Sequence, residues 1–216
     1  MAALPHAIEA IVKGGGRVAV HVNPGMFNER AVRLKSGTVV PVANVPRPHE
    51  LEQLGAQVVN DPDARLLLDD HFYYSGEIPR ITPFEKGRVD HLARTGPEAP
   101  WEPDPLLMDE RMLVAHVRHL GLIVFSACSH AGIVNVLTHA RAASPSVRLW
   151  GAMGGLHLSG STEAIIPETV ADLGRFGLGV LAPGHCTGWR AMAALARELG
   201  DLLVPSAVGK RYRFGE

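Results

Sequence analysis

The chain has 216 residues, of which 46% are hydrophobic and 20% are charged, and its formal net charge is −1. A domain commonly takes about 150 residues, so we expect one domain over 1–216 with a core of its own. The near-zero charge argues against a polybasic nucleic-acid binder, and the apolar runs are too short to cross a bilayer. Eleven histidines stand out, because histidine is the commonest metal ligand in proteins.

The first half of the chain carries helix and strand signals in alternation. Apolar residues at helical spacing predict a helix over 3–13, which a run of three glycines ends. Strands are expected at 17–22, on both sides of a Ser36-Gly37 turn within 30–45, at 58–59 and at 66–68, with a short helix at 49–54. Segment 75–110 holds six prolines and no regular period, so we predict an irregular insertion there.

The second half alternates strands and helices as α/β proteins do. Strands are predicted at 113–117, 122–127, 147–152 and 179–182, and helices at 132–143, 167–176 and 189–199. Two short closing strands are expected at 202–204 and 211–214. The sequence therefore predicts an α/β fold.

Three of the eleven histidines follow successive predicted strands. His130 comes just after the strand that ends at residue 127, His157 follows the next strand, and His185 follows the one after that. In α/β folds, residues at the carboxyl ends of strands converge on the ligand crevice. We therefore expect these imidazoles to approach one another in a polar or metal-binding cleft.

Four short motifs occur in order along the chain. They are Ser75-Gly76-Glu77-Ile78-Pro79-Arg80, Cys128-Ser129-His130-Ala131-Gly132, Gly154-Gly155-Leu156-His157-Leu158 and His185-Cys186-Thr187-Gly188. These motifs resemble those of the metallo-β-lactamase superfamily, in the 7,8-dihydropterin-6-methyl-4-(β-D-ribofuranosyl)aminobenzene 5′-phosphate synthase-like branch. The resemblance implies a metallo-β-lactamase-like αββα sandwich and a metal-dependent hydrolase-like or pterin-pathway enzyme. It also implies a dihydropterin or a phosphorylated small molecule as substrate.

The resemblance also assigns roles to particular side chains. His130 would ligate one divalent metal and His185 a second one, with zinc expected first and iron or manganese as alternatives. His157, Ser129 and Arg80 would bind the substrate, and the resemblance names no catalytic acid or base. A single ion held jointly by the three histidines is the physical alternative.

The chain lacks the main metal motif of that superfamily, His-x-His-x-Asp-His. Its eleven histidines include no His-x-His pair. We therefore expect a fold that is incomplete at its N-terminus, with weak or no metal binding by this chain alone. The motif would then precede an internal start, come from another chain, or be absent from a truncated relative. The alternatives to an enzyme are a non-catalytic binding module and a half-site completed in a homo-oligomer.

Two cysteines exclude a disulfide framework, and we expect reduced thiols in a cytoplasmic protein, since no secretory signal is recognisable. Cys128 stands close to His130 in the sequence, but an inert cysteine is favoured over a nucleophile. The expected partner is a small-molecule substrate, with no nucleic acid and no membrane.

Overall fold

The computed structural model describes residues 3–215, which form two compact units. The first unit runs to Pro62 and also includes Val89–Pro105, and the second comprises Asp63–Arg88 and the chain from Leu106 onward. Each unit has a separate cluster of buried apolar side chains. The single domain expected over 1–216 stays a prediction.

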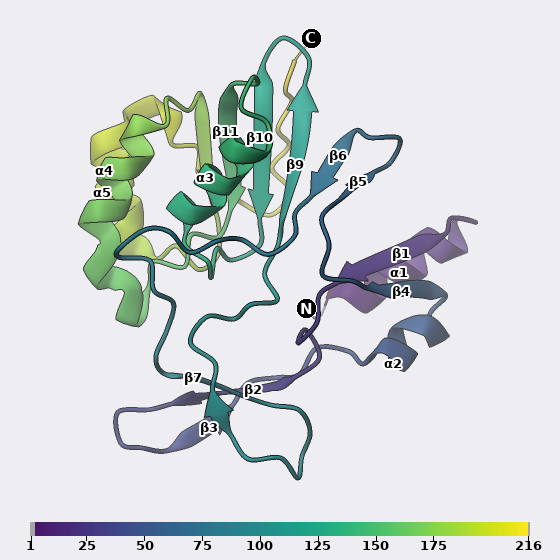
Figure 1. The fold of residues 1–216 in the computed structure, drawn as a ribbon. Coiled ribbons are helices and arrows are strands. Elements are labelled where there is room, and N and C mark those ends of the chain that lie inside the picture. The colour runs from purple at the N-terminus through teal and green to yellow at the C-terminus, as the bar shows by residue number, and fades with distance from the viewer. Residues whose placement is uncertain (1–2, 216) are drawn as a thin grey trace. The chain divides into compact units, whose positions relative to one another are not determined.

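In the first unit, two helices pack against a pair of parallel strands (Figure 1). The elements are α1 (Ala3–Lys13), β1 (Val18–Val22), α2 (Pro48–Gln53) and β4 (Ala56–Asn60). Ile8 from α1 and Leu51 from α2 are each only 1% exposed and form the centre of this core. The glycine run ends α1 as predicted, because Gly15 takes a φ of 80°, which glycine adopts without steric cost.

The same unit contains a small antiparallel sheet in the order β3-β2-β7-β8. Its strands are β2 (Glu29–Arg33), β3 (Val39–Pro41), β7 (His91–Arg94) and β8 (Glu102–Pro103). The predicted hairpin joins β2 to β3 through Gly37, whose φ is 86°. The prediction of loop throughout 75–110 is wrong, because β7 and β8 lie within it. These strands have only four and two residues, and β2 pairs with β7 from more than fifty residues away, so no local period marks them.

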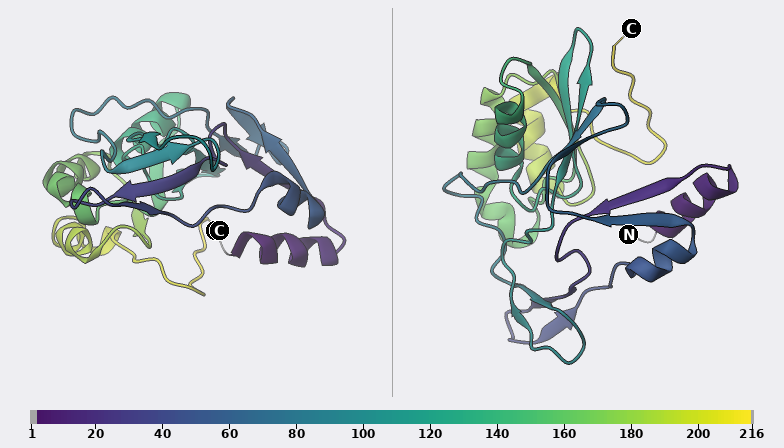
Figure 2. Two further views of the ribbon diagram at one scale, coloured as in Figure 1. Left: turned by 90° about the horizontal axis from the view of Figure 1, so that it is seen from below. Right: turned by 45° about the vertical axis from the view of Figure 1, so that its right-hand side comes forward.

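The second unit is built on a six-stranded sheet in the order β12-β11-β10-β9-β6-β5. The strands are β5 (Arg65–Leu67), β6 (Phe72–Tyr74), β9 (Met112–Val117), β10 (Gly121–Ser126), β11 (Leu149–Gly154) and β12 (Val180–Pro183). Helices α3 (Ile133–Ala143), α4 (Ile166–Arg175) and α5 (Trp189–Leu199) cover one face of this sheet (Figures 1 and 2). Among residues 3–215, no helix is both long and apolar enough to cross a membrane.

The C-terminal prediction is wrong in its secondary structure. Leu202 ends a short 3-10 helix, Leu203 makes only an isolated bridge to Leu181, and residues 211–214 form no strand. Phe214 packs edge-on against Trp150 of β11, with ring centroids 5.6 Å apart. A short apolar run indicates burial but does not by itself determine the secondary structure. Here the Phe214 ring packs against the sheet although its backbone pairs with no strand.

Strands β10, β11 and β12 are parallel, so their carboxyl ends meet at one edge of the sheet. Backbone bonds continue this alignment beyond the strands. The Gly155 N–H donates to the Ala127 carbonyl oxygen at 3.0 Å, and the Gly184 N–H donates to the Gly154 carbonyl oxygen at 2.8 Å. The segments that carry the three motif histidines therefore lie side by side.

Candidate functional site

The segment before Arg88 is attached to the N-terminus of α3 by a buried carboxylate. The N-cap of α3 is Gly132, which offers no side chain to the free backbone N–H groups. Glu85 supplies the missing acceptors, since its two oxygens accept the N–H groups of Val134 and Asn135, each at 2.9 Å. Gly132 has a φ of 91°, and a Cβ there would overlap the Glu85 carboxyl group. Burial raises the pKa of Glu85, although these hydrogen bonds act against the shift.

A buried amide fixes the same segment at a second point. The Asn135 Oδ1 accepts the N–H groups of Ile81 and Thr82, each at 2.9 Å, and its Nδ2 donates to the Ala131 carbonyl oxygen at 2.8 Å. Asn135 is fully buried, so these bonds satisfy polar atoms that water does not reach. Residues 81–88 are thus held against the loop after β10 without forming regular secondary structure.

The backbone around His130 is held from two sides. Arg80 donates from Nη1 to the His130 carbonyl oxygen at 2.8 Å, and its Nη2 donates to the Leu106 carbonyl oxygen. The Glu110 carboxylate accepts the Ala131 N–H at 2.6 Å, and burial raises the pKa of this carboxyl. Arg80 was expected to bind substrate, but its guanidinium faces these carbonyl oxygens and does not line the pocket.

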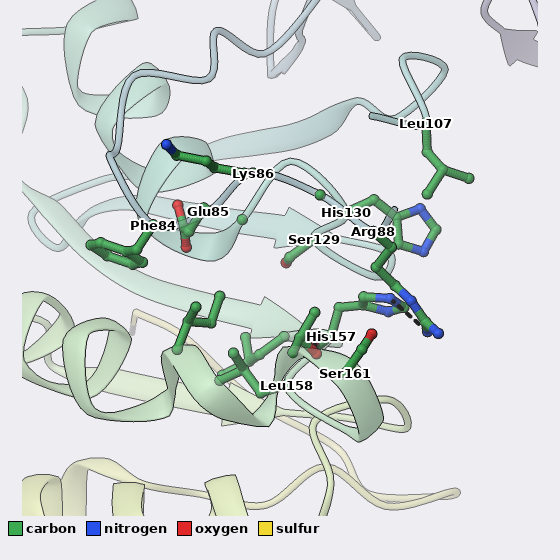
Figure 3. Close-up of a pocket in the computed structure, with 15 residues that line it drawn as sticks. Phe84, Glu85, Lys86, Arg88, Leu107, Ser129, His130, His157, Leu158 and Ser161 are labelled. Carbon is green, nitrogen blue, oxygen red and sulfur yellow. Dashed lines mark hydrogen bonds between the residues drawn. The ribbon is translucent and has the colours of Figure 1, made fainter. Parts of the chain in front are cut away.

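The predicted site residues His130, His157 and Ser129 all line one pocket (Figure 3). The pocket encloses about 80 Å³, and its lining includes residues 84–88, Leu156, His157, Leu158, Ser161 and Thr162. Arg88 Nη1 lies 3.5 Å from His157 Nε2, and the rings of His130 and His157 meet edge to face with centroids 4.6 Å apart. The Lys86 amine points away from this group. We call Arg88, His130 and His157 the basic cluster.

Two pocket residues have a backbone conformation that is unusual for side chains other than glycine. Ser129 has a φ of 59° and His157 a φ of 49°. Such conformations cost about 1–3 kcal/mol each and concentrate at functional sites. The Ser129 hydroxyl, 2% exposed as a residue, donates to the Gly155 carbonyl oxygen at 2.7 Å. This bond holds the turn after β10 to the turn after β11.

His185 belongs to a different group, which we call the thiol cluster: Cys128, His185 and Cys186. Cys128 Sγ lies 2.9 Å from His185 Nε2, and the three possible ligand atoms all lie within 4.8 Å of one another. The His157 backbone N–H donates to Cys186 Sγ at 3.3 Å. His185 is exposed and the two cysteines are half-buried. Neither Cys128 nor Cys186 forms a disulfide. Sequence reasoning missed this cluster.

The Cys128 and Cys186 thiols are close enough to shift each other's pKa. A hydrogen bond from Cys128 lowers the pKa of Cys186 well below its usual value, and hydrogen bonds from His157 together with the neighbouring His185 act in the same direction. The same interaction raises the pKa of Cys128. The pKa values of the two neighbouring thiols are therefore shifted in opposite directions.

The residues do not fit the two-metal centre that the motifs imply. The resemblance assigns His130 and His185 to separate metals, and the basic cluster that contains His130 is not among the groups of possible ligands close enough for one ion within residues 3–215. Within residues 3–215, the atoms grouped closely enough for one ion are those of Cys128, His185 and Cys186, and the three histidines form no such group. The ligand roles of His130 and His185 stay predictions, as do the substrate-binding roles.

The fold is that of the metallo-β-lactamase superfamily, as the motifs predicted. A search of solved structures matches the crystal structure of Tm1679, a metal-dependent hydrolase of the beta-lactamase superfamily, with a TM-score of 0.73 and 20% identity. The match covers 92% of this chain and 72% of that one. No family model matches the chain.

Two proteins of Methanocaldococcus jannaschii are similar over part of their length. One is 7,8-dihydropterin-6-methyl-4-(beta-D-ribofuranosyl)-aminobenzene-5'-phosphate synthase, 29% identical over 107 residues that cover 50% of this chain and 36% of that protein. The other is the uncharacterized protein MJ0448, 24% identical over 147 residues that cover 68% of this chain and 51% of that protein. The chain thus spans about a third to a half of these relatives, and the first of them supports the predicted branch.

Proposed function

We propose that this chain binds a small phosphorylated molecule through its basic cluster, as part of a hydrolase-like or pterin-pathway enzyme. The observation that carries the proposal is the placement of Arg88, His130 and His157 at one end of a single pocket. One distant relative is a synthase whose name includes a 5'-phosphate, so such a ligand agrees with that likeness.

The charges around the pocket favour an anion. The Glu85 carboxylate is the acidic group among the lining residues, and its oxygens are engaged by the N-terminus of α3. The Arg88 guanidinium is a planar fork that matches two phosphate oxygens, and such charged hydrogen bonds are stronger than neutral ones. An imidazole N–H beside it supplies a further donor.

The volume of the pocket limits which part of a substrate can enter it. Its volume of about 80 Å³ holds a few waters or one phosphate group. Pockets for whole drug-sized ligands take about 300–1,000 Å³. The pocket therefore fits the phosphate end of a molecule, while the remainder of that molecule lies outside it.

The chain's own residues bind and orient such a ligand. Arg80 and Glu110 both fix the peptide group that joins His130 to Ala131, and the Gly155 carbonyl oxygen fixes Ser129. Strained backbone at Ser129 and His157 then directs the neighbouring side chains without further rearrangement. Among residues 3–215, the group of possible ligands close enough for one ion includes neither His130 nor His157, so the alternative is a module that binds the same anion without turnover.

The test is titration calorimetry of the reduced chain with ribose 5-phosphate and with ribose. Binding of the phosphate ester alone is expected, and Arg88→Ala should weaken it about tenfold or more, as expected for loss of a charged hydrogen bond. Arg197→Ala removes an exposed arginine of α5 and should leave the affinity unchanged. Equal binding of ribose, or full affinity in Arg88→Ala, would show that the proposal is wrong.

Turnover separates the enzyme from the binding module. Hydrolysis of a chromogenic phosphate ester by the same preparation, lost in Arg88→Ala, supports an enzyme. Phosphate binding without hydrolysis supports the binding module.

A further inference from the structure

We propose that Cys128, His185 and Cys186 form a binding site for one zinc ion, distinct from the basic cluster. Two sulfur atoms and one imidazole nitrogen lie within 4.8 Å of one another. The pocket of the basic cluster is lined by none of these three side chains. This site goes beyond the proposed anion binding, and neither of its cysteines was expected to bind metal from the sequence.

Backbone topology brings the three ligands together. Cys128 follows β10, while His185 and Cys186 follow β12, and β11 lies between these two parallel strands. The segment after β11 leaves room for the ligands only because residue 155 is glycine. A Cβ at Gly155 would overlap Cys186 Sγ and lie 2.9 Å from His185 Cε1. The ligands thus gather over a position that has no side chain.

The spacing suits tetrahedral coordination. With zinc–sulfur bonds of about 2.3 Å and zinc–nitrogen bonds of about 2.0 Å, tetrahedral angles set a sulfur and a nitrogen about 3.5 Å apart and two sulfurs about 3.8 Å apart. Cys128 Sγ and His185 Nε2 are 2.9 Å apart without an ion. Rotation of the exposed His185 side chain can open this distance without moving the backbone.

The surroundings support thiolate ligands and leave one position open. The His157 N–H donates to Cys186 Sγ, and such bonds orient a metal-bound sulfur. Sulfur and imidazole ligands favour zinc over magnesium or manganese, which prefer oxygen. Three protein ligands at a partly exposed site leave a fourth position for water or a small ligand.

The experiment is titration of the reduced, chelator-treated chain with cobalt(II), followed by competition with zinc. A tetrahedral thiolate site is expected to give a sulfur-to-cobalt charge-transfer band, with one equivalent bound and displaced by zinc. Cys128→Ser, Cys186→Ser and His185→Ala should each weaken binding by more than about 100-fold, because even indirect partners of a metal cost 10–100-fold. His185 is exposed, so His185→Ala tests the site without disturbing the core.

Two matched variants make the result decisive. His116→Ala removes an exposed histidine of β9, and His130→Ala removes a histidine of the basic cluster. Both should keep the charge-transfer band and the affinity within about twofold of the unaltered chain. Absence of the band, or its retention in both cysteine variants, would overturn the proposal. Loss of cobalt in His130→Ala with retention in His185→Ala would likewise overturn it and favour a histidine site.

Discussion

The basic cluster and the thiol cluster lie beside the ends of adjacent strands and yet have different chemistry. Cys128 and His130 are two residues apart, but one belongs to the thiol cluster and the other to the basic cluster. Ser129 stands between them with a φ of 59°, and its hydroxyl is bonded to the Gly155 carbonyl oxygen. A left-handed residue redirects the chain, so nearness in sequence does not place two side chains around one ligand.

His157 shows the same division within one residue. Its backbone N–H donates to Cys186 of the thiol cluster, while its Nε2 lies 3.5 Å from Arg88 of the basic cluster. The chemistry of each cluster therefore depends on which side chains contact its histidine. Position at a strand end brings histidines close together, and their neighbours decide whether an anion or a metal suits them.

The largest effect is expected from Gly155→Ala, which breaks the thiol cluster without changing any ligand. The added Cβ overlaps Cys186 Sγ and lies 3.0 Å from the Ala127 carbonyl oxygen, so the sulfur or the backbone must move. We expect cobalt affinity to fall more than about 100-fold and the free energy of unfolding to fall by about 1–3 kcal/mol. Cobalt absorption and urea denaturation measure the two effects.

The matched control is Gly174→Ala on helix α4. A Cβ there meets no atom within 4 Å, and alanine is the better helix former. This variant should keep the cobalt band and gain stability. If Gly155→Ala binds cobalt as the unaltered chain does, then the thiol cluster does not need the space that glycine leaves.

The second largest effect is expected from Glu85→Ala. This change should weaken phosphate binding by the basic cluster, because Glu85 anchors the segment that carries Arg88. The variant leaves the buried N–H groups of Val134 and Asn135 without the Glu85 acceptors. The free energy of unfolding should therefore fall by about 1–3 kcal/mol. Phosphate affinity should fall with it, because residues 84–88 form one wall of the pocket. Denaturant unfolding and calorimetry measure both changes.

The exposed Glu77 belongs to the same irregular segment, so Glu77→Ala is the control and should alter neither quantity. Unchanged stability in Glu85→Ala would mean that the capping of α3 does not depend on this carboxylate.

Local patterns predicted those parts of the fold that depend on neighbours in the sequence. Helix α1 ends at its glycine run, and β10 appears as a continuous apolar stretch because it is buried on both faces. Parallel strands also placed the three histidines at one edge of the sheet. Strands β7 and β8 left no comparable signal, because their partner β2 is remote in the sequence.

The parts of the site that sequence reasoning missed depend on long-range contacts. Glu85 caps α3 across 49 residues, and Cys128 meets His185 across 57. The direction of a side chain after a strand depends on individual φ values, such as those of Ser129 and His157, which composition and periodicity do not report. One usable signal was present: Cys186 directly follows the motif histidine His185, and a single residue separates Cys128 from His130.

The smallest effect is expected from Ser129→Ala, which acts on the turn that divides the two clusters. The hydroxyl's bond to the Gly155 carbonyl oxygen contributes about 1 kcal/mol. Without it, the turns after β10 and β11 keep only the backbone bond from the Gly155 N–H to the Ala127 carbonyl oxygen as a direct link. Cobalt affinity and phosphate affinity should therefore fall together, each by a few-fold. Ser161 lines the pocket but does not belong to the thiol cluster. Ser161→Ala should therefore change phosphate affinity without changing cobalt binding. A Ser129→Ala variant in which only one affinity falls would mean that the clusters are held independently, because a shared turn must transmit its loosening to both.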